Sequence, residues 1–198
     1  RVIARPFIGN AKDGFTRTKN RRDFSLEPTG PTILDLTKAK GMEVVAVGKI
    51  EDIFEHRGMT RTDHTTNNHD GIEKTIQFLK DDFEGLLFTN LVDTDMIYGH
   101  RNDVEGYAGA LEYFDSRLPE ITALLHPDDL LLMTADHGND PSWSGTDHTR
   151  EKIPVLFSGA GIGCKQLKPM QTFADIGQTI ADYMKIEPTL TGTKADLF

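Results

Sequence analysis

Aspartate and histidine side chains gather in three short segments of this 198-residue sequence: 93–100, 136–140 and 145–149. The candidate ligands in these segments are Asp95, His100, Asp136, His137 and His148. Carboxylate oxygens combined with imidazole nitrogens suit a divalent ion such as manganese or zinc, and neighbouring glycines let adjacent side chains converge. A single such residue is usually a cap or a turn residue, but three clusters together indicate a metal site.

Two of these clusters directly follow apolar segments typical of buried strands, at 86–92 and 130–134. In open α/β sheets, ligands bind beyond the carboxyl ends of the strands, so we expect the clusters to meet at one edge of a sheet. Cys164 is the only cysteine, which excludes a thiolate zinc site and an internal disulfide. A reducing cytoplasm is therefore the expected location.

The pattern around the clusters predicts alternating helices and strands. Expected strands span 44–47, 86–92, 130–134 and 155–157, and expected helices span 31–40, 70–81, 103–125 and 173–184. Pro119 is expected to kink the third helix or to split it in two. Strands that are apolar on both faces and separated by helices favour a mainly parallel sheet covered on each side. The predicted fold class is therefore α/β with three layers.

Composition and charge narrow the possible partners. Hydrophobic residues make up 37% and charged residues 27% of the chain, as in a globular protein. The net charge of −9 argues against nucleic acid as the main partner, since that binding neutralises phosphates. No apolar run approaches the roughly 18 residues of a membrane span, and no signal peptide is recognisable, so we expect no membrane partner.

A change in composition near residue 30 predicts two domains. Residues 1–30 are rich in Arg, Gly and Asn, and the Pro- and Gly-containing stretch that closes them is typical of a linker. Residues 1–22 hold seven basic side chains against Asp13, which indicates either a solvated face or a rim that attracts a small anionic substrate. The first residue is not Met, so we expect a fragment or a processed product.

The three clusters resemble the metal-site signatures of the phosphopentomutase family, in the alkaline phosphatase superfamily. The similar stretches are Asp-Met-Ile-Tyr-Gly-His-Arg at 95–101, Ala-Asp-His-Gly-Asn-Asp-Pro at 135–141 and Gly-Thr-Asp-His-Thr-Arg-Glu at 145–151. The resemblance covers the whole chain but only the C-terminal half of that family's enzymes. It implies that 31–198 is part of an alkaline-phosphatase-like, metal-binding core and that 1–30 is the C-terminal end of a smaller α+β cap domain.

The resemblance also implies roles for single residues. One manganese ion would be held by Asp95, His100 and His148. A second would be held by Asp136 and His137. The distal phosphate of the substrate would be bound by Arg1, Arg17 and Lys49, with Ile3 beside the sugar. The same ligand types also suit Zn²⁺ or Mg²⁺.

The implied activity is that of a phosphopentomutase, an isomerase of pentose phosphate and nucleotide metabolism. A phosphothreonine enzyme with two Mn²⁺ ions would interconvert the 1- and 5-phosphates of ribose or 2-deoxyribose, with a sugar bisphosphate as activator. The nucleophilic threonine is expected in an N-terminal part that this chain lacks. We therefore expect the chain alone to be inactive, its partner to be that N-terminal part, and the protein to be a monomer.

Two alternatives stay open. Cofactor-independent phosphoglycerate mutase shares the two-metal core, although Asp147 before His148 and Tyr98-Gly99 before His100 favour the pentomutase. From another functional class, the chain is interpretable as a non-catalytic metal-binding remnant. That alternative predicts metal-dependent folding without activity.

Overall fold

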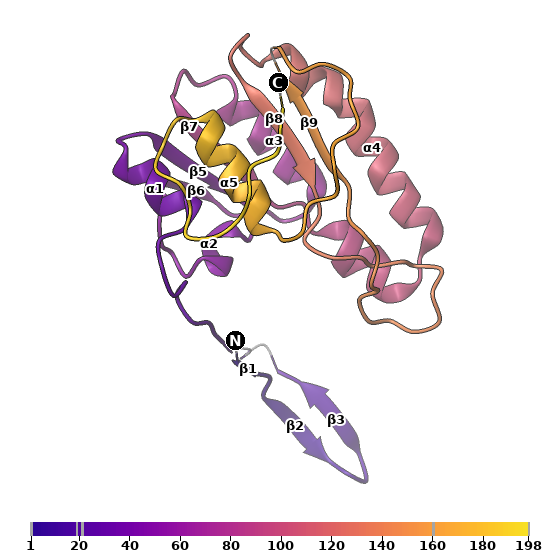
Figure 1. Ribbon diagram of the computed structural model, residues 1–198. Helices are drawn as coiled ribbons and strands as arrows, with labels where there is room; N and C mark the ends of the chain where they lie inside the picture. The colour runs from indigo at the N-terminus through magenta and orange to yellow at the C-terminus, as the bar shows by residue number, and fades with distance from the viewer. Residues whose placement is uncertain (1, 19, 21, 160, 198) are drawn as a thin grey trace.

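The structure is a computed structural model and describes residues 2–18, 20, 22–159 and 161–197. Within these residues the chain forms an α/β core, and a two-stranded sheet projects from it (Figure 1). The core helices are α1 (Ile33–Ala39), α2 (Ile50–Ile53), α3 (Asn68–Phe78), α4 (Val104–Ala123) and α5 (Ala174–Tyr183). The core strands are β5 (Glu43–Val47), β6 (Arg61–Asp63), β7 (Gly85–Thr89), β8 (Leu130–Thr134) and β9 (Val155–Gly159). The predicted α/β class is confirmed.

A parallel sheet with the strand order β6-β5-β7 forms the centre of the core. Val45 of β5 is aligned with Arg61 of β6 on one side and with Leu87 of β7 on the other. Val44 and Val47 have no exposed surface. Successive side chains of a strand point to opposite faces, so β5 is covered on both sides, as its unbroken apolar sequence predicts.

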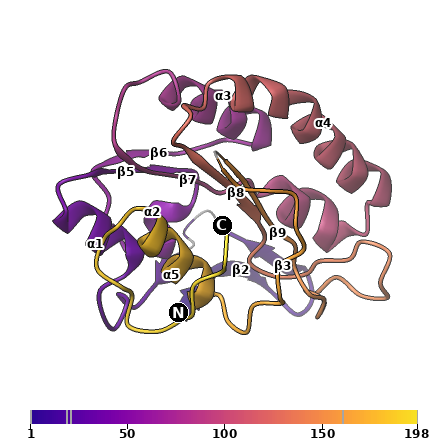
Figure 2. The same cartoon turned by 45° about the horizontal axis from the view of Figure 1, so that its top comes forward.

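Two apolar clusters attach helices to this sheet. In one, Leu34 of α1 packs with Val44 and Met59. In the other, Ile72 of α3 packs with Ile121 of α4. Figure 2 shows α1, α2 and α5 on one side of the parallel strands and α3 and α4 on the other. The three layers predicted from the sequence are therefore present.

The helices largely follow the expected ranges. At the start of α1, Thr32 and Asp35 cap each other's backbone N–H groups. Of the two outcomes expected at Pro119, the split is wrong, because α4 continues through the proline from Val104 to Ala123, and the kink stays a prediction. One hydrogen bond is lost at the proline, but burial of Ile121 against α3 keeps the last turns of the helix in place. None of the described helices is long and apolar enough to cross a membrane.

The last two core strands pair differently from the central three. β8 and β9 are antiparallel, with Leu132 opposite Phe157. Their apolar sequences resemble those of fully buried strands, yet every residue of β8 keeps some exposure, and Leu156 of β9 is 54% exposed. The parallel arrangement therefore belongs to β5, β6 and β7, and the β8–β9 pair leaves apolar surface uncovered.

Four short strands precede the core. β1 (Val2–Ala4) pairs with β4 (Arg22–Phe24), and β2 (Phe7–Asn10) pairs with β3 (Gly14–Arg17), both antiparallel. Phe7 and Phe15 meet edge to face across the second pair, with ring centroids 5.2 Å apart. The described part of this segment contains strands and no helix, so the expected α+β cap domain is not shown. The domain boundary at residue 30 stays a prediction.

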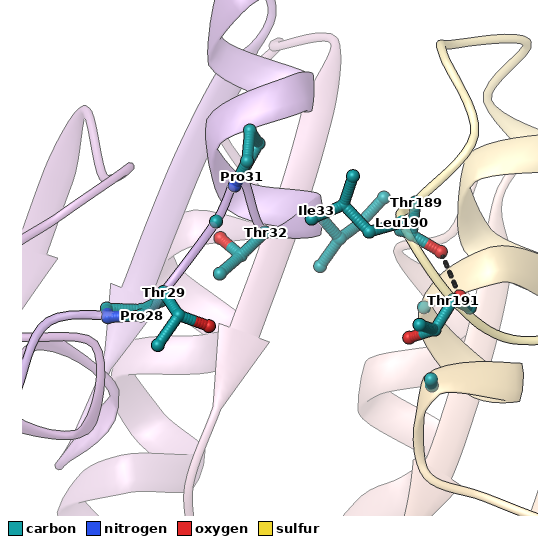
Figure 3. Close-up of a pocket in the computed structure, with 11 residues that line it drawn as sticks. Pro28, Thr29, Pro31, Thr32, Ile33, Thr189, Leu190 and Thr191 are labelled. Atoms are coloured by element: carbon teal, nitrogen blue, oxygen red, sulfur yellow. Dashed lines mark hydrogen bonds between the residues drawn. The ribbon is translucent and has the colours of Figure 1, made fainter.

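The linker that follows these strands is held by one arginine. Arg57 donates hydrogen bonds to the carbonyl oxygens of Pro28 and Gly30 and to the carboxylate of Asp35, at 2.9, 3.2 and 3.0 Å. A cavity of about 370 Å³ lies between this linker and the segment 189–191 (Figure 3). None of the described candidate metal ligands lines it, so the chemistry suggested by the sequence must be sought elsewhere.

Candidate metal centre

The segments that carry the candidate ligands meet at one edge of the core. Asp95 lies in a π-helical turn after β7, η1 (Thr94–Tyr98), and His100 lies in the 3-10 turn that follows, η2 (Gly99–Arg101). Asp136 and His137 come directly after β8, and His148 lies in the loop that leads towards β9. The clusters therefore meet beyond strand ends as expected, but these strands belong to two sheets and not to one, since β7 pairs with β5 and β8 pairs with β9.

A pair of buried polar residues fixes the chain where β7 ends. The carboxylate of Asp93 accepts from the backbone N–H of Asn68, and the amide oxygen of Asn68 accepts from the N–H of Asp93, at 2.7 and 2.9 Å. Both side chains are only 7% exposed. Buried polar groups need such partners, so this exchange anchors the turn that carries Asp95 to the start of α3.

Asp95 is the centre of the ligand cluster. Its Oδ1 atom lies 3.2 Å from Nε2 of His148 and 3.3 Å from Nε2 of His100. One ligand atom from each of Asp95, His137 and His148 lies within 4.8 Å of the others. Asp136 is 76% exposed, and its carboxylate lies 3.6 Å from Nε2 of His137. Donor atoms from three separate segments are thus close enough to share a cation.

The three imidazole rings lie in a stack. His137 and His148 have ring centroids 3.6 Å apart and planes inclined by 18°, and His100 lies 4.9 Å from His148 at 24°. A metal ion binds an imidazole through the lone pair of a ring nitrogen. The stack therefore places three potential nitrogen ligands side by side.

Backbone carbonyls hold two of these rings by their other nitrogen. Nδ1 of His100 lies 2.6 Å from the carbonyl oxygen of Thr146, and Nδ1 of His137 lies 3.1 Å from that of Gly138. A carbonyl can only accept, so Nδ1 carries a proton, and in the neutral tautomer that this allows the lone pair lies on Nε2. Metal-binding histidines are usually oriented in this way. The donor set and its supporting contacts therefore fit a divalent ion.

Asn139 was not singled out by the sequence, yet it holds the central carboxylate. Its amide nitrogen donates to Oδ1 of Asp95 at 2.6 Å, and the side chain is only 8% exposed. It fits there because residue 99 is glycine: a Cβ atom at Gly99 would lie 2.4 Å from the Asn139 amide nitrogen. The one signal for Asn139 was its position two residues after His137 in the second cluster.

The surroundings of the cluster are negatively charged. Burial and, after it, the carboxylates of Asp95, Glu151 and Asp140 raise the pKa of the Tyr107 hydroxyl. Ser142 donates from its hydroxyl and its backbone N–H to Asp140, which lowers the pKa of that carboxyl group. Carboxylates held in their charged form favour a cation nearby.

The four candidate substrate-binding residues are more widely spread. Arg1 lies outside the described residues. Ile3 lies on β1 and Arg17 on β3, both exposed and ahead of the core. Lys49 caps the start of α2, and its ammonium group contacts the sulfur of Met96, the residue after Asp95. Of the four, Lys49 is therefore the residue that the described contacts connect to the ligand cluster.

Known proteins resemble the chain in sequence. A phosphopentomutase of Clostridioides difficile is 55% identical over 201 residues, which cover 100% of this chain and 52% of the relative. Phosphopentomutases of Acetivibrio thermocellus and Caldanaerobacter subterraneus are 54% and 55% identical, over 97% and 98% of this chain. The chain thus spans about half the length of the curated relatives that it matches.

The fold also has a match among solved structures. The PH0037 protein from Pyrococcus horikoshii superimposes with a TM-score of 0.56 over 74% of this chain and 46% of its own, at 19% identity. This likeness concerns the fold alone. Residues 17–188 match the Metalloenzyme superfamily, and this range includes all five candidate metal ligands. The chain therefore belongs to the Metalloenzyme superfamily.

Proposed function

We propose that this chain is the metal-binding, C-terminal half of a phosphopentomutase. The observation that carries the proposal is the convergence of Asp95, His137 and His148, whose ligand atoms lie within 4.8 Å of one another. The relatives at 54–55% identity are phosphopentomutases, which supports the same activity for the protein to which this chain contributes.

We assign the ligands to two ions. Asp95, His100 and His148 hold the first, and Asp136 and His137 hold part of the second, which is completed by residues outside this chain. The distances from Asp95 to His148 and to His100 support the first group, and the 3.6 Å between Asp136 and His137 supports the second. His137 also stacks on His148, which is compatible with two neighbouring ions about 3.5–4 Å apart. We propose Mn²⁺ for both.

When bound, such ions neutralise the charge that develops during phosphoryl transfer. The chain's own residues would orient the metal ligands and hold the substrate. Asn139 fixes Asp95, and Lys49 lies beside the cluster with its ammonium group available to the distal phosphate of a pentose phosphate. Arg1 and Arg17 would bind the same phosphate, since a guanidinium contacts two oxygens at once, and Ile3 would lie against the sugar.

The nucleophile would come from outside this chain. In this proposal a threonine of the N-terminal half carries the phosphoryl group, and a sugar bisphosphate keeps it loaded. The uncovered apolar residues support such a partner: Leu156 on β9 and Phe173 before α5 are 54% and 60% exposed. We expect the N-terminal half to pack there and the chain alone to give no mutase turnover.

A chimera tests the proposal directly. The matching half of the Clostridioides difficile phosphopentomutase is replaced by this chain, and conversion of ribose 1-phosphate to ribose 5-phosphate is followed with Mn²⁺ and a sugar bisphosphate. Activity is expected in the chimera and not in this chain alone. His148→Ala in the chimera should abolish it, whereas His126→Ala, outside the cluster after α4, should not.

Other outcomes would redirect the assignment. A folded chimera that is inactive on ribose 1-phosphate but converts 3-phosphoglycerate would make the chain part of a phosphoglycerate mutase. A folded, Mn²⁺-loaded chimera that is inactive on both substrates would contradict the catalytic proposal.

A further inference from the structure

Asn102 connects two distant parts of the ligand region through its side-chain amide. It follows η2 directly and has a left-handed backbone, with φ at 54°. Its amide nitrogen lies 3.1 Å from the carbonyl oxygen of Pro141, 2.9 Å from that of Trp143 and 2.9 Å from that of Gly145. A single side chain thus contacts alternate carbonyls of a loop that is 39 to 43 residues away in sequence.

The shape of this loop depends on the amide. Three carbonyl oxygens point at one nitrogen, and an amide group has two hydrogens to share among them. Without that donor the negative ends of three carbonyl dipoles would face one another, and the loop would turn them out to water instead. Asn102 therefore adds a donor at the centre of the 141–145 loop, beside the contacts that Ser142 and Trp143 make with Asp140.

The loop continues directly into the ligand cluster. The next carbonyl, that of Thr146, accepts from Nδ1 of His100 at 2.6 Å. Two residues further on, Nε2 of His148 lies 3.2 Å from Asp95. Asn102 itself comes two residues after His100. The same turn of chain that supplies His100 therefore also fixes the loop that supplies His148.

We propose that Asn102 is a positioning residue that sets the metal affinity of the centre by holding the 141–145 loop. This inference rests on the metal-binding role given to Asp95, His100 and His148 in the proposed function. Asn102 contacts no ligand atom of the cluster. By holding the loop, it sets how far His148 lies from Asp95 on η1 and His100 on η2.

Two substitutions remove the amide and keep the backbone. Asn102→Gly suits the left-handed conformation, and Asn102→Asp keeps the size but replaces the donor by an acceptor. Lys185→Gly is the matched control, because Lys185 has φ at 53° after α5 and lies outside the cluster. Mn²⁺ and Co²⁺ binding is measured by equilibrium dialysis on all variants.

The loop carries its own probe. Trp143 is the only tryptophan of the sequence and is 62% exposed, so its fluorescence anisotropy reports the mobility of the 141–145 loop. For both Asn102 variants we expect Mn²⁺ affinity to fall about 10- to 100-fold, the range seen when support of a metal ligand is lost. The anisotropy of Trp143 should fall, and the far-UV circular dichroism should stay that of the wild type. Lys185→Gly should change neither quantity.

His148→Ala separates the possible failures. If His148→Ala weakens Mn²⁺ binding and the Asn102 variants bind as tightly as the wild type, the role of Asn102 is wrong and the metal site stands. Equal binding by wild type and His148→Ala would overturn the metal site and, with it, this inference. Lower affinity in the Asn102 variants with unchanged anisotropy would also contradict positioning through the loop.

Discussion

Asp95 and Asp175 are both carboxylates with several close polar partners, yet their partners differ in kind. Asp175, at the start of α5 and 6% exposed, accepts from the backbone N–H groups of Gln171, Thr172 and Thr193 at 2.8, 3.2 and 2.8 Å. Asp95 is contacted by the side chain of Asn139 and by two imidazoles. The partners of Asp175 are mainly backbone N–H groups, whereas those of Asp95 are side chains, two of which can bind a cation through a ring nitrogen.

This difference separates a structural carboxylate from the one that we propose as a metal ligand. Backbone donors from Thr193 and then Gln171 and Thr172 lower the pKa of Asp175 and tie the C-terminal segment to α5. The positive ends of these N–H groups face the carboxylate, so its surroundings do not favour a cation. The imidazoles around Asp95 have lone pairs of their own, so the same carboxylate oxygen can exchange their contacts for a shared metal.

The sharpest test of this difference is Asp95→Asn, which removes the charge and keeps the size. We expect Mn²⁺ affinity to fall by more than the roughly 100-fold that loss of a supporting partner costs. The melting temperature of the metal-free protein should hardly change. Equilibrium dialysis with Mn²⁺ and a thermal melt measure the two effects. Undiminished Mn²⁺ binding would remove Asp95 from the ligand set.

Asn139→Asp should have the next largest effect on the metal. The new carboxylate would face Asp95 at the distance of the present hydrogen bond, 2.6 Å, and repel it. We expect Mn²⁺ affinity to fall about 10- to 100-fold. Asn10→Asp makes the same change of charge on β2 and serves as the control. Equal affinities in the two variants would mean that Asn139 does not orient Asp95.

Asp175→Asn should lower the stability of the protein and leave its metal affinity unchanged, the opposite of Asp95→Asn. An amide nitrogen would face backbone N–H groups that need an acceptor, so the melting temperature should fall by several degrees while Mn²⁺ affinity stays unchanged. A loss of Mn²⁺ affinity without a change in melting temperature would reverse the roles that we give to the two carboxylates.

The effect of Asp175→Asn on the melting temperature should depend on pH. The pKa of Asp175 is lowered in the folded protein, so its stabilisation is present above the ordinary carboxyl range and is lost as pH falls through the folded value. The gap in melting temperature between wild type and Asp175→Asn should therefore be constant near neutral pH and close below about pH 4. Thermal melts between neutral and acid pH measure it.

The smallest effect is expected at a pair in which His56 is exposed and Glu51 is partly buried. Glu51 lies 3.1 Å from Nδ1 of His56, which raises the pKa of His56. Glu51→Gln should lower the His56 pKa in an NMR titration and leave Mn²⁺ affinity unchanged. The stabilisation that the Glu51–His56 pair gives the folded protein is present below the ordinary pKa of histidine. It is lost as the pH rises through the raised pKa of His56. An unmoved His56 pKa would contradict this pairing.

Residue types and apolar runs predicted much of this architecture. The candidate ligands stand out because carboxylates and imidazoles follow strand ends. The strands β5, β7, β8 and β9 and the helices α1, α3, α4 and α5 appear close to their expected ranges. β6 was not predicted, because its three residues, Arg61 to Asp63, carry no apolar pattern. The antiparallel pairing of β8 and β9 could not be predicted, because an apolar run does not indicate whether its strand pairs in a parallel or an antiparallel way.

The supporting asparagines were harder to find. Asn102 and Asn139 are common polar residues whose importance depends on partners about 40 residues away, and only the folded chain brings these together. The exposure of β8 was also hidden, because the sequence pattern indicates which surface is suited to burial and not whether this chain covers it. The π-helical turn at Asp95 has no apolar period to indicate it.

That turn has a consequence for how this stretch can change over generations. Asp95 and His100 are separated by five positions, and the N–H of Gly99 bonds back to the carbonyl of Thr94 across the same interval, the period of a π-helix. Loss of one codon between them would leave a separation of four positions, at which an ordinary α-helical turn also places two side chains on one face. A single deletion could therefore replace the π-helical turn by an α-helical one, whereas a substitution at Gly99 would place a Cβ atom against the Asn139 amide.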